Sequence, residues 1–502
     1  MGTTQVDKSS RDSTAASDEK GDFDQKNADL PQHVDTEAEK RAVRKQDYAI
    51  VPVMTMFYLL SFLDRANIGN ARVAGLQRDL GLSDHQYQIC VTVLYAPYIL
   101  AELPSNLLLK YIGPKYLMPA LLTTWGVVVT LQGLVSSFAG LVVVRAILGL
   151  IEGPMFPGIV LYLSGFYTRK ELSLRIALFF SSASLSGAFS GLLAAGIENM
   201  HGVGGKPGWS WIFILEGLFS VLMGVIGFWL VPSTPRDHRF LTHEEQELIV
   251  ARLERDRPTL DSEEKFSFKE VFRSFTSPHV IIVFIVFFMI GTTLYGLALF
   301  LPSIVKQLGF SANKSQLLSV GPFAAGFFVT LIGAYWSDRY QMRGIPTMCI
   351  SLLAIAGYAL YLNANEKFVA YGALYLMVPG IYATAPIVSA WMANNSEPHY
   401  RRATSIAAGF IATNSGGILS TWRFPTKEGP KFRKTTIMNL VFAIIMVVGS
   451  ALNMAYLYQK NKEKKRAGYR EKMLSKYSDD KEGQVKAWME LGDKHPDFQY
   501  NL

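Results

Sequence analysis

Residues 59–70 read LLSFLDRANIGN, so an apolar run meets an aspartate and an arginine with no turn residue between them. The apolar run 49–63 has 15 residues. As a helix it covers about 22 Å, which is less than the ~30 Å of hydrocarbon in a bilayer. If the helix spans, Asp64 and Arg65 lie inside the membrane, where a charge needs a partner or a water-filled cavity. The alternative is a helix that ends at the membrane interface.

Neighbouring residues on a helix point about 100° apart, so Asp64 and Arg65 cannot simply neutralise each other. We expect each of them to have a different partner. The fourth apolar stretch offers candidates in VVVRAILGLIEGPMFPG (142–158), because Arg145 and Glu152 are the ionisable residues between Gly140 and Gly158.

Arg145 and Glu152 are seven residues apart and therefore project from one face of a helix. The alternative is a structural ion pair, but a rise of about 10 Å between them is long for a direct salt bridge. The functional interpretation is a cationic site beside a carboxylate that can lose and regain a proton. Burial favours the neutral acid and a nearby arginine favours the carboxylate, so a substrate could switch the proton.

Apolar stretches of membrane-spanning length recur along all 502 residues, of which 18% are charged. With the stretch at 48–67 they predict an all-α membrane protein with twelve transmembrane helices. The other eleven are 85–109, 117–137, 139–163, 174–197, 209–231, 279–301, 315–336, 345–363, 368–393, 403–422 and 434–458.

Hydrophilic segments divide these helices into two sets of six. The expected units are a disordered cytoplasmic tail (1–47), an N-terminal six-helix bundle (48–231), a cytoplasmic connector (232–277), a C-terminal six-helix bundle (278–459) and a second cytoplasmic tail (460–502). In the connector, Thr242 followed by Glu245 predicts the capped start of a short surface helix.

Basic residues set the expected orientation. KRAVRK (40–45) and KNKEKKR (460–466) lie directly against the first and last helices, which favours cytoplasmic termini. The basic segment RFPTKEGPKFRK (423–434) opposes this assignment. The sequon at Asn313 then falls in an outer loop. The net charge of +8 follows from membrane topology and needs no nucleic-acid partner.

Several chemistries are excluded by the residues present. The two cysteines, Cys90 and Cys349, both fall in expected spans, which argues against a disulfide framework, a zinc site and an iron–sulfur site. The sequence has no P-loop, no H-E-x-x-H and no G-x-S-x-G in a strand–turn–helix context. We therefore expect neither an enzyme nor a cofactor or metal.

Two corresponding loops carry a family resemblance. GAYWSDRYQMRG (333–344) resembles the glycine and Asp-Arg loop motif of the major facilitator superfamily, with Gly333, Asp338 and Arg339 in the matching places. NLLLKYIGPK (106–115) keeps Lys110, Gly113 and Lys115 but lacks the Asp-Arg pair. Together with ELPSNLLLK (102–110) and LDRANIGNARV (63–73), it resembles the fungal anion:cation symporter branch, which includes allantoate, pantothenate and nicotinate permeases.

The resemblance implies roles for particular residues. In that branch the matching positions serve proton coupling (Glu152, Asp64), anion binding (Arg65, Arg145) and substrate contact in the eleventh helix (Asn414). Asn414 could equally form only a packing hydrogen bond. Tyr95 and Tyr98 could line the cavity, with helix packing as the alternative. Three further positions are weaker: Glu102 is expected to be buried in a structural or coupling role, and Glu198 and Glu216 to lie at the membrane interface.

The resemblance implies a proton-coupled importer of a small organic anion, with a monocarboxylate such as nicotinate or another vitamin-like acid as the first expectation. The alternatives are a nutrient transceptor and a proton-antiport exporter of secondary metabolites. The expected fifth helix (174–197) has no proline, which disfavours the exporter. Its expected partners are the anion, protons and the lipid bilayer, with a monomeric chain in a fungal plasma membrane or, alternatively, a vacuolar membrane.

Overall fold

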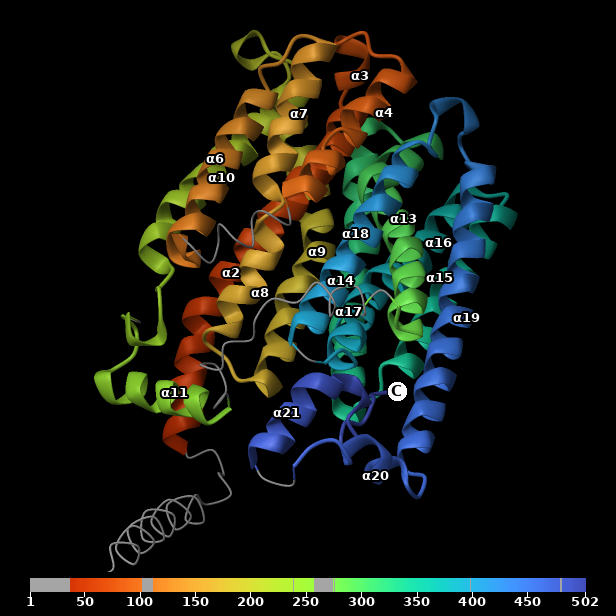
Figure 1. Ribbon diagram of the computed structural model, residues 1–502. Coiled ribbons are helices and arrows are strands. Elements are labelled where there is room, and N and C mark those ends of the chain that lie inside the picture. Colours follow the sequence, from red (N-terminus) through yellow and green to blue (C-terminus); the bar gives the residue numbers. More distant parts are fainter. Residues whose placement is uncertain are drawn as a thin grey trace, which may run out of the picture.

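The computed structural model describes residues 37–101, 112–237, 239–256, 274, 276–397, 399–478 and 481–502, and every regular element in these ranges is a helix. Figure 1 shows the long helices running in roughly the same direction, with early ones on the left and late ones on the right. We call residues before the connector the first half and those after it the second half. The all-α prediction is confirmed for the described residues.

The first half contains the elements up to the connector helix. They are α2 (Glu37–Val73), α3 (Leu76–Asp79), α4 (Asp84–Thr92), α6 (Pro114–Gln132), α7 (Phe138–Glu152), α8 (Met155–Ser164), α9 (Arg169–Ile197) and α10 (Gly208–Leu230). The connector helix itself is α11 (His243–Asp256). Residues 95–101 are also helical and continue the second span.

The second half has the same alternation of long helices. They are α13 (Pro278–Gln307), α14 (Ala312–Tyr340), α15 (Gly344–Asn363), α16 (Lys367–Tyr382), α17 (Thr384–Asn394), α18 (His399–Thr421), α19 (Arg433–Lys464), α20 (Tyr469–Leu474) and α21 (Lys481–Leu491). Both α2 and α19 extend past the expected bundle limits at residues 48 and 459.

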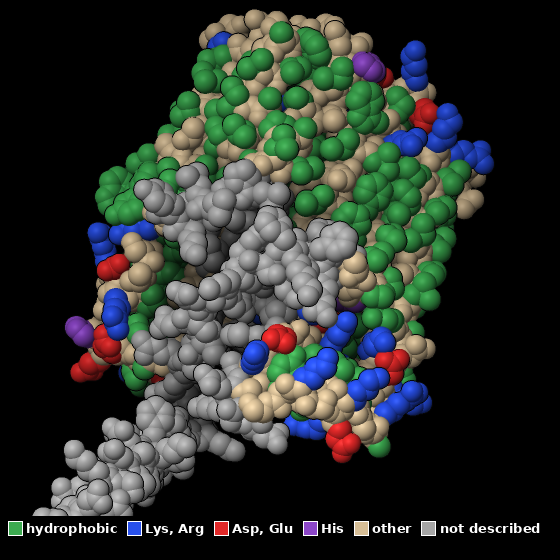
Figure 2. All heavy atoms as spheres, in the orientation of Figure 1, with side chains coloured by type: hydrophobic (Ala, Val, Ile, Leu, Met, Phe, Trp, Pro, Cys, Tyr) green, Lys and Arg blue, Asp and Glu red, His purple; other side chains and the backbone are tan. Residues whose placement is uncertain are grey.

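Eight of the described helices are long and apolar enough to cross a membrane by themselves, with α16 and α17 counted as one span. The other expected spans hold shorter or more polar helices: α4 with residues 95–101, α6, α7 with α8, and α18. The fourth span divides at Pro154, because proline has no N–H to continue the helical hydrogen bonds. Figure 2 shows hydrophobic side chains covering the flank of the molecule, with most charges near its ends.

The side on which α2 begins, here called the Glu37 side, carries the connector helix. Thr242 and Glu245 cap α11 reciprocally, as the sequence predicts: the Glu245 N–H donates to Thr242 Oγ1 at 3.3 Å, and the Thr242 N–H donates to Glu245 Oε2 at 3.0 Å. Lys45 Nζ lies 2.6 Å from Glu245 Oε1. Apolar contacts between Ala42 and the α11 side chain Ile249 complete this attachment of the connector to α2.

The last ten residues dock on the Glu37 side of the second half. Asn395 donates to the Asn501 carbonyl oxygen at 2.9 Å and accepts from the Asn501 N–H at 2.8 Å. Trp391 Nε1 also donates to the Asn501 carbonyl. The Leu502 carbonyl oxygen accepts from the Arg343 N–H at the start of α15. These bonds tie the segment 493–502 to α15 and α17.

On the opposite side, here called the Val73 side, the two halves contact each other directly. Arg72 Nη2 donates to Thr426 Oγ1 at 2.9 Å, and Thr426 Oγ1 donates to Asp84 Oδ1 at 2.9 Å. Lys306 Nζ donates to the Val73 carbonyl at 2.9 Å. A Cβ at Gly69 would lie 2.1 Å from the Leu299 carbonyl oxygen, so glycine is needed for this close approach of α2 to α13.

The Asp84 carboxylate should hold the Val73 side closed. Partial burial alone would raise the pKa of Asp84, but hydrogen bonds from Gln77 and Thr426 and the charge of Arg72 outweigh it and the pKa is lowered. Ionised Asp84 therefore stabilises the closed Val73 side fully above the usual carboxyl pKa of about 4. This stabilisation is lost as the pH falls through the lowered pKa of Asp84. We expect Asp84→Asn to open this side at neutral pH and the unmodified protein to open in acid.

Spin labels at Val203 and Phe368, both exposed on the Val73 side, can measure this opening after Cys349→Ser. Pulsed electron resonance should show a larger share of long distances in Asp84→Asn. The matched control is Asp79→Asn, because Asp79 bonds to Arg78 and Trp209 within the first half. Equal distance distributions in both variants and the parent would contradict the prediction.

The docked segment 493–502 should depend on Asn395. Asn395→Ala removes two hydrogen bonds to Asn501, each of which contributes about 1 kcal/mol. Amide hydrogen exchange in 493–502 should then accelerate about 30-fold. The control is Asn363→Ala, on the exposed end of α15. Unchanged exchange in Asn395→Ala would show that other contacts hold the segment.

Candidate functional site

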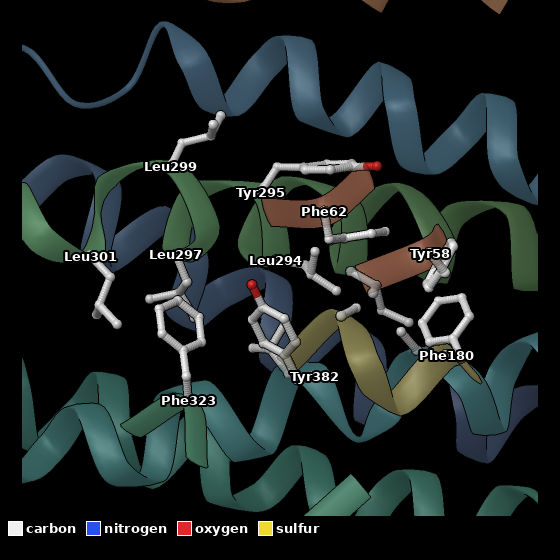
Figure 3. Close-up of a cluster of buried hydrophobic side chains, with 14 of the residues drawn as sticks. Tyr58, Phe62, Phe180, Leu294, Tyr295, Leu297, Leu299, Leu301, Phe323 and Tyr382 are labelled. Carbon is white, nitrogen blue, oxygen red and sulfur yellow. The ribbon is translucent and has the colours of Figure 1, made fainter. Parts of the chain in front are cut away.

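A pocket lies at the centre of the molecule between the two halves. Its lining is strongly aromatic, and Arg65 is the one charged side chain among the described residues that form it. The aromatic and aliphatic members are Tyr58, Phe62, Tyr98, Phe156, Phe180, Phe287, Ile290, Leu294, Tyr295, Ala385 and Phe410. The small polar members are Ser61, Ser389, Thr413 and Asn414. Figure 3 shows Phe62 and Tyr58 of α2 facing Leu294 of α13, with Phe180 beside Tyr58.

Arg65 is held by one carboxylate and several rings. Its Nε donates to Glu152 Oε1 at 2.6 Å. Ser61, one turn earlier on α2, donates to the same oxygen at 2.5 Å. The guanidinium carbon lies 4.5 Å from the centre of the Tyr98 ring, which is within the range of a cation–π contact. Arg65 is 5% exposed and Glu152 is 1% exposed, so water contributes little screening.

A chain of hydrogen bonds continues from Arg65 into the second half. Arg65 Nη1 donates to the Tyr295 hydroxyl on α13 at 2.8 Å. The Tyr295 hydroxyl donates to Asn414 Oδ1 on α18 at 3.2 Å. Glu152, Arg65, Tyr295 and Asn414 therefore form a buried polar connection across the boundary between the halves.

Asp64 points away from this pocket. Its Oδ2 accepts from Trp125 Nε1 at 2.7 Å, inside the first half. Asp64 and Arg65 thus have different partners, as the rotation between neighbouring helical residues requires. The structure brings Arg65 and Glu152 together at the pocket and places Asp64 behind it.

Arg145 also stays outside the pocket lining. It is 1% exposed, and its Nε donates to the Cys90 carbonyl oxygen at 3.2 Å. Its Nη1 forms no hydrogen bond with any described residue. A Cβ at Gly149, between Arg145 and Glu152 on α7, would lie 2.1 Å from the Leu94 carbonyl, so α7 packs very closely on the second span. This close contact explains why Arg145 reaches the backbone there.

The two tyrosines of the second span differ in position. Tyr98 lines the pocket and stacks on Arg65. Tyr95 contacts the Tyr295 ring edge-on, with centroids 5.3 Å apart, and does not belong to the pocket lining. Asn414 is 1% exposed and does line the pocket. The structure therefore favours cavity contact for Tyr98 and Asn414, and helix packing for Tyr95.

The loop motif lies at the Glu37 side of α14. A Cβ at Gly333 would be 2.6 Å from Ile350 Cδ1, so this glycine permits close packing of α14 on α15. Asp338 forms its ion pair with Arg343, whose Nη1 also donates to Ser337 Oγ at 2.8 Å. Arg339 is exposed. Arg343, which the sequence motif did not single out, thus serves as the partner of Asp338.

The remaining expected residues divide between described and undescribed parts. Glu102 and Lys110 lie outside the described residues. Glu198 begins a short 3-10 helix, Glu198–Met200.

The expectation of an interfacial position is wrong for Glu216, which is 5% exposed and accepts a hydrogen bond from Asn67 on α2. Asn313 was expected in a loop but lies in the first turn of α14, and its Nδ2 donates to the Ala195 carbonyl at 3.0 Å.

Sequence reasoning missed Tyr295, Ser61 and Trp125, which bind the charged groups directly. Tyr295 follows two threonines in GTTLYG (291–296), and this polar interruption of an apolar helix is the signal that could have identified it. Ser61 lies one turn before Arg65 and could have been found from the i, i+4 spacing. Trp125 lies in an apolar stretch where nothing distinguishes it. Among the described residues, no group of three His, Cys, Asp or Glu could hold a metal ion.

Comparison with known proteins agrees with this architecture. A high-affinity nicotinic acid transporter of Saccharomyces cerevisiae is 33% identical over 92% of this chain and 85% of its own length. An uncharacterized transporter of Schizosaccharomyces pombe is 35% identical over 84% of each chain. A crystal structure of a bacterial homologue of the human lysosomal transporter Spinster, inward-facing and unoccupied, is similar with a TM-score of 0.65 and 16% identity, over 82% of this chain and 97% of that one.

The family model described as Major Facilitator Superfamily matches residues 54–421, which includes α2 and Arg65 as well as α18 and Asn414. The similar proteins named above are transporters rather than enzymes. The twelve-helix architecture expected from the sequence is thereby confirmed. This chain belongs to the major facilitator superfamily and is a multi-pass membrane transporter.

Proposed function

We propose that this transporter imports a small aromatic monocarboxylate, such as nicotinate, together with protons. The observation that carries the proposal is the composition of the central pocket. It offers one cation, Arg65, surrounded by aromatic rings. A flat ring with a single carboxylate matches such a lining, since rings stack on aromatic side chains and one arginine can bind one carboxylate. The nicotinic acid transporter among its relatives supports the same class of substrate.

The ion pair between Arg65 and Glu152 beside the pocket supports the proposed coupling to protons. Arg65 and Glu152 neutralise each other at 2.6 Å. A substrate carboxylate that binds Arg65 competes with Glu152 for the same guanidinium. Glu152 then loses its counter-charge in the membrane interior, where an unpaired charge is costly, and a proton can replace the lost charge. Binding of one anion therefore promotes uptake of one proton, and the loaded site remains neutral.

The same contacts connect binding to movement of the two halves. Arg65 and Glu152 belong to the first half, and Tyr295 and Asn414 to the second. A substrate in the pocket touches both sets and replaces part of this polar chain. The Val73 side is closed by contacts between the halves, and we assign it to the outside of a fungal plasma membrane, with both termini cytoplasmic. The chain acts as a monomer in this proposal.

The first test concerns Arg65. Arg65→Lys keeps the charge but loses the planar fork that can bind a carboxylate through two hydrogen bonds. A charge-assisted hydrogen bond contributes about 1.5–3 kcal/mol, so nicotinate affinity should fall by about ten- to hundredfold. Equilibrium binding of labelled nicotinate to the purified protein measures this effect.

Two matched variants sharpen this test. Arg145→Lys should weaken binding less, because Arg145 bonds to the Cys90 carbonyl and does not line the pocket. Arg339→Lys, on the exposed end of α14, should leave affinity unchanged. Full affinity in Arg65→Lys would remove Arg65 from the binding site.

The second test concerns Glu152. Gln has nearly the same shape and mimics the protonated acid permanently. Glu152→Gln should bind nicotinate and exchange it in counterflow, but it should lose accumulation driven by a pH gradient. Proteoliposomes allow both measurements on one preparation, with the exposed Glu366→Gln as the control. Normal gradient-driven accumulation by Glu152→Gln would contradict a coupling role.

The direction of the gradient separates import from export. A symporter accumulates the anion when the outer medium is acidic relative to the vesicle lumen. A proton antiporter accumulates it when the lumen is the acidic side. Accumulation under the second gradient alone would favour the exporter, and saturable binding with no flux under either gradient would favour the transceptor.

A further inference from the structure

The central pocket encloses less space than its proposed substrate needs. Its free volume is about 30 Å³, whereas pockets for small organic ligands enclose about 300–1,000 Å³. A cavity of this size holds about one water molecule. Side chains that line the pocket must therefore move before an aromatic acid can enter it.

Aromatic rings fill the part of the pocket that faces the Glu37 side. Tyr58 lies seven residues before Arg65 on α2, which is about 10 Å towards the Glu37 side. Its ring centroid is 5.7 Å from that of Phe156 on α8 and 5.8 Å from that of Phe180 on α9. All three rings belong to the first half and line the pocket. Figure 3 shows Tyr58 and Phe180 beside each other.

A ring from the second half completes this group. Phe410 on α18 lines the pocket, and its ring centroid lies 4.1 Å from that of Phe156, with the ring planes tilted by 44°. Aromatic pairs usually have centroids about 4.5–7 Å apart, in offset-stacked or edge-to-face arrangements. The Phe156–Phe410 pair has neither arrangement at its short distance. The two rings therefore press against each other across the boundary between the halves without the favoured geometry.

The sequence positions of the two rings relate them to the polar part of the pocket. Phe156 lies four residues after Glu152, and Phe410 lies four residues before Asn414. Each ring is thus about one helical turn, or about 6 Å, from a polar group on the Glu152–Arg65–Tyr295–Asn414 chain. An acid whose carboxylate binds Arg65 would therefore place its ring at the level of Phe156 and Phe410.

The fourth span is interrupted beside Phe156. The helix α7 ends at Glu152 and α8 begins at Met155, with Gly153 and Pro154 between them. A helix that is interrupted by proline can bend at that point. Phe156 can therefore move away from Phe410 with α8 while Glu152 keeps its place on α7.

The alternative is an ordinary packing contact between the halves. Such a contact would affect every substrate alike, because it only holds the halves together. A pair of rings that admits the substrate acts differently. A flat aromatic ring between Phe156 and Phe410 replaces one ring contact by two, whereas an aliphatic acid offers no ring face to either side chain.

We propose that Phe156 and Phe410 are specificity-determining residues whose rings hold the place of the substrate's ring. An aromatic acid enters between them while its carboxylate binds Arg65, so its ring takes over a contact between the halves. This inference rests on the proposed import of an aromatic monocarboxylate and adds the residues that recognise the ring. A non-aromatic acid of the same size lacks this recognition.

Binding of two ring acids of similar size, nicotinate and cyclohexanecarboxylate, tests this selectivity. Both carry one carboxylate, but cyclohexanecarboxylate has no aromatic face. An aromatic pair contributes a factor of about two to ten in binding, so Phe410→Leu and Phe156→Leu should each weaken nicotinate binding by about that factor. Cyclohexanecarboxylate binding, measured by competition with labelled nicotinate, should change clearly less. The control is Phe310→Leu, because Phe310 packs edge-on against Phe368 and Tyr371 outside the pocket.

Labelling of an introduced cysteine tests the position of the rings without any substrate. Thr413 lines the pocket, and Thr413→Cys can be made in a Cys349→Ser background, in which the remaining Cys90 is buried. The aromatic thiol reagent benzyl methanethiosulfonate should react slowly with this cysteine. Phe410→Ala should accelerate the reaction severalfold, because it removes a ring that fills the pocket. Phe310→Ala should leave the rate unchanged.

Two results would overturn the proposal. Equal losses of affinity for nicotinate and cyclohexanecarboxylate in both leucine variants would make the ring pair an ordinary packing contact. An unchanged labelling rate in Phe410→Ala would show that its ring does not fill the pocket. Because labelling needs no carboxylate, faster labelling in Phe410→Ala beside a parent protein that binds no nicotinate would contradict the proposed function and still support an aromatic subsite between the rings.

Discussion

The structure depends on how a buried arginine, Arg65, is kept neutralised at the boundary between two halves of a membrane protein. An isolated cation there would be strongly unfavourable. Glu152 supplies the counter-charge at 2.6 Å, while Tyr98 and Tyr295 supply a ring face and a hydroxyl. Each of these partners belongs to a different helix. Satisfying one side chain therefore fixes the relative positions of α2, α7, α13 and the second span.

The geometry of the backbone makes this arrangement possible. Glycine at position 69 lets α2 approach the α13 carbonyl of Leu299, and glycine at position 149 lets α7 approach the Leu94 carbonyl. A buried hydrogen bond from Ser61 to Glu152 joins α2 to α7 as well. In a bilayer, where apolar faces gain little by leaving lipid, such close packing and buried hydrogen bonds carry the association of helices.

The sequence predicted the helices and the membrane position of Asp64 and Arg65, but it did not predict most of the side chains that contact them. Apolar length alone identifies the spans, and the short run 49–63 places Asp64 and Arg65 inside the membrane. Their partners come from helices distant in sequence, so spacing could not show that Trp125 binds Asp64 or that Tyr295 bridges to Asn414. The expected interfacial position of Glu216 was wrong, because the position of a residue along a helix does not show which face of the helix is turned inward. Family resemblance supplied Asn414, whose place in the pocket follows from α18 packing on α13.

The polar interior of the first half also explains why the two arginines cannot be equivalent. Arg65 lines the pocket, whereas Arg145 is enclosed and bonds to a backbone carbonyl. A backbone carbonyl is an obligatory acceptor but carries no full charge, so it orients Arg145 without neutralising it. One carboxylate within electrostatic range of Arg145 is Glu152, which forms its direct ion pair with Arg65. Of these two arginines, Arg65 is the one that borders the pocket, so it is the one whose surroundings a bound solute can change.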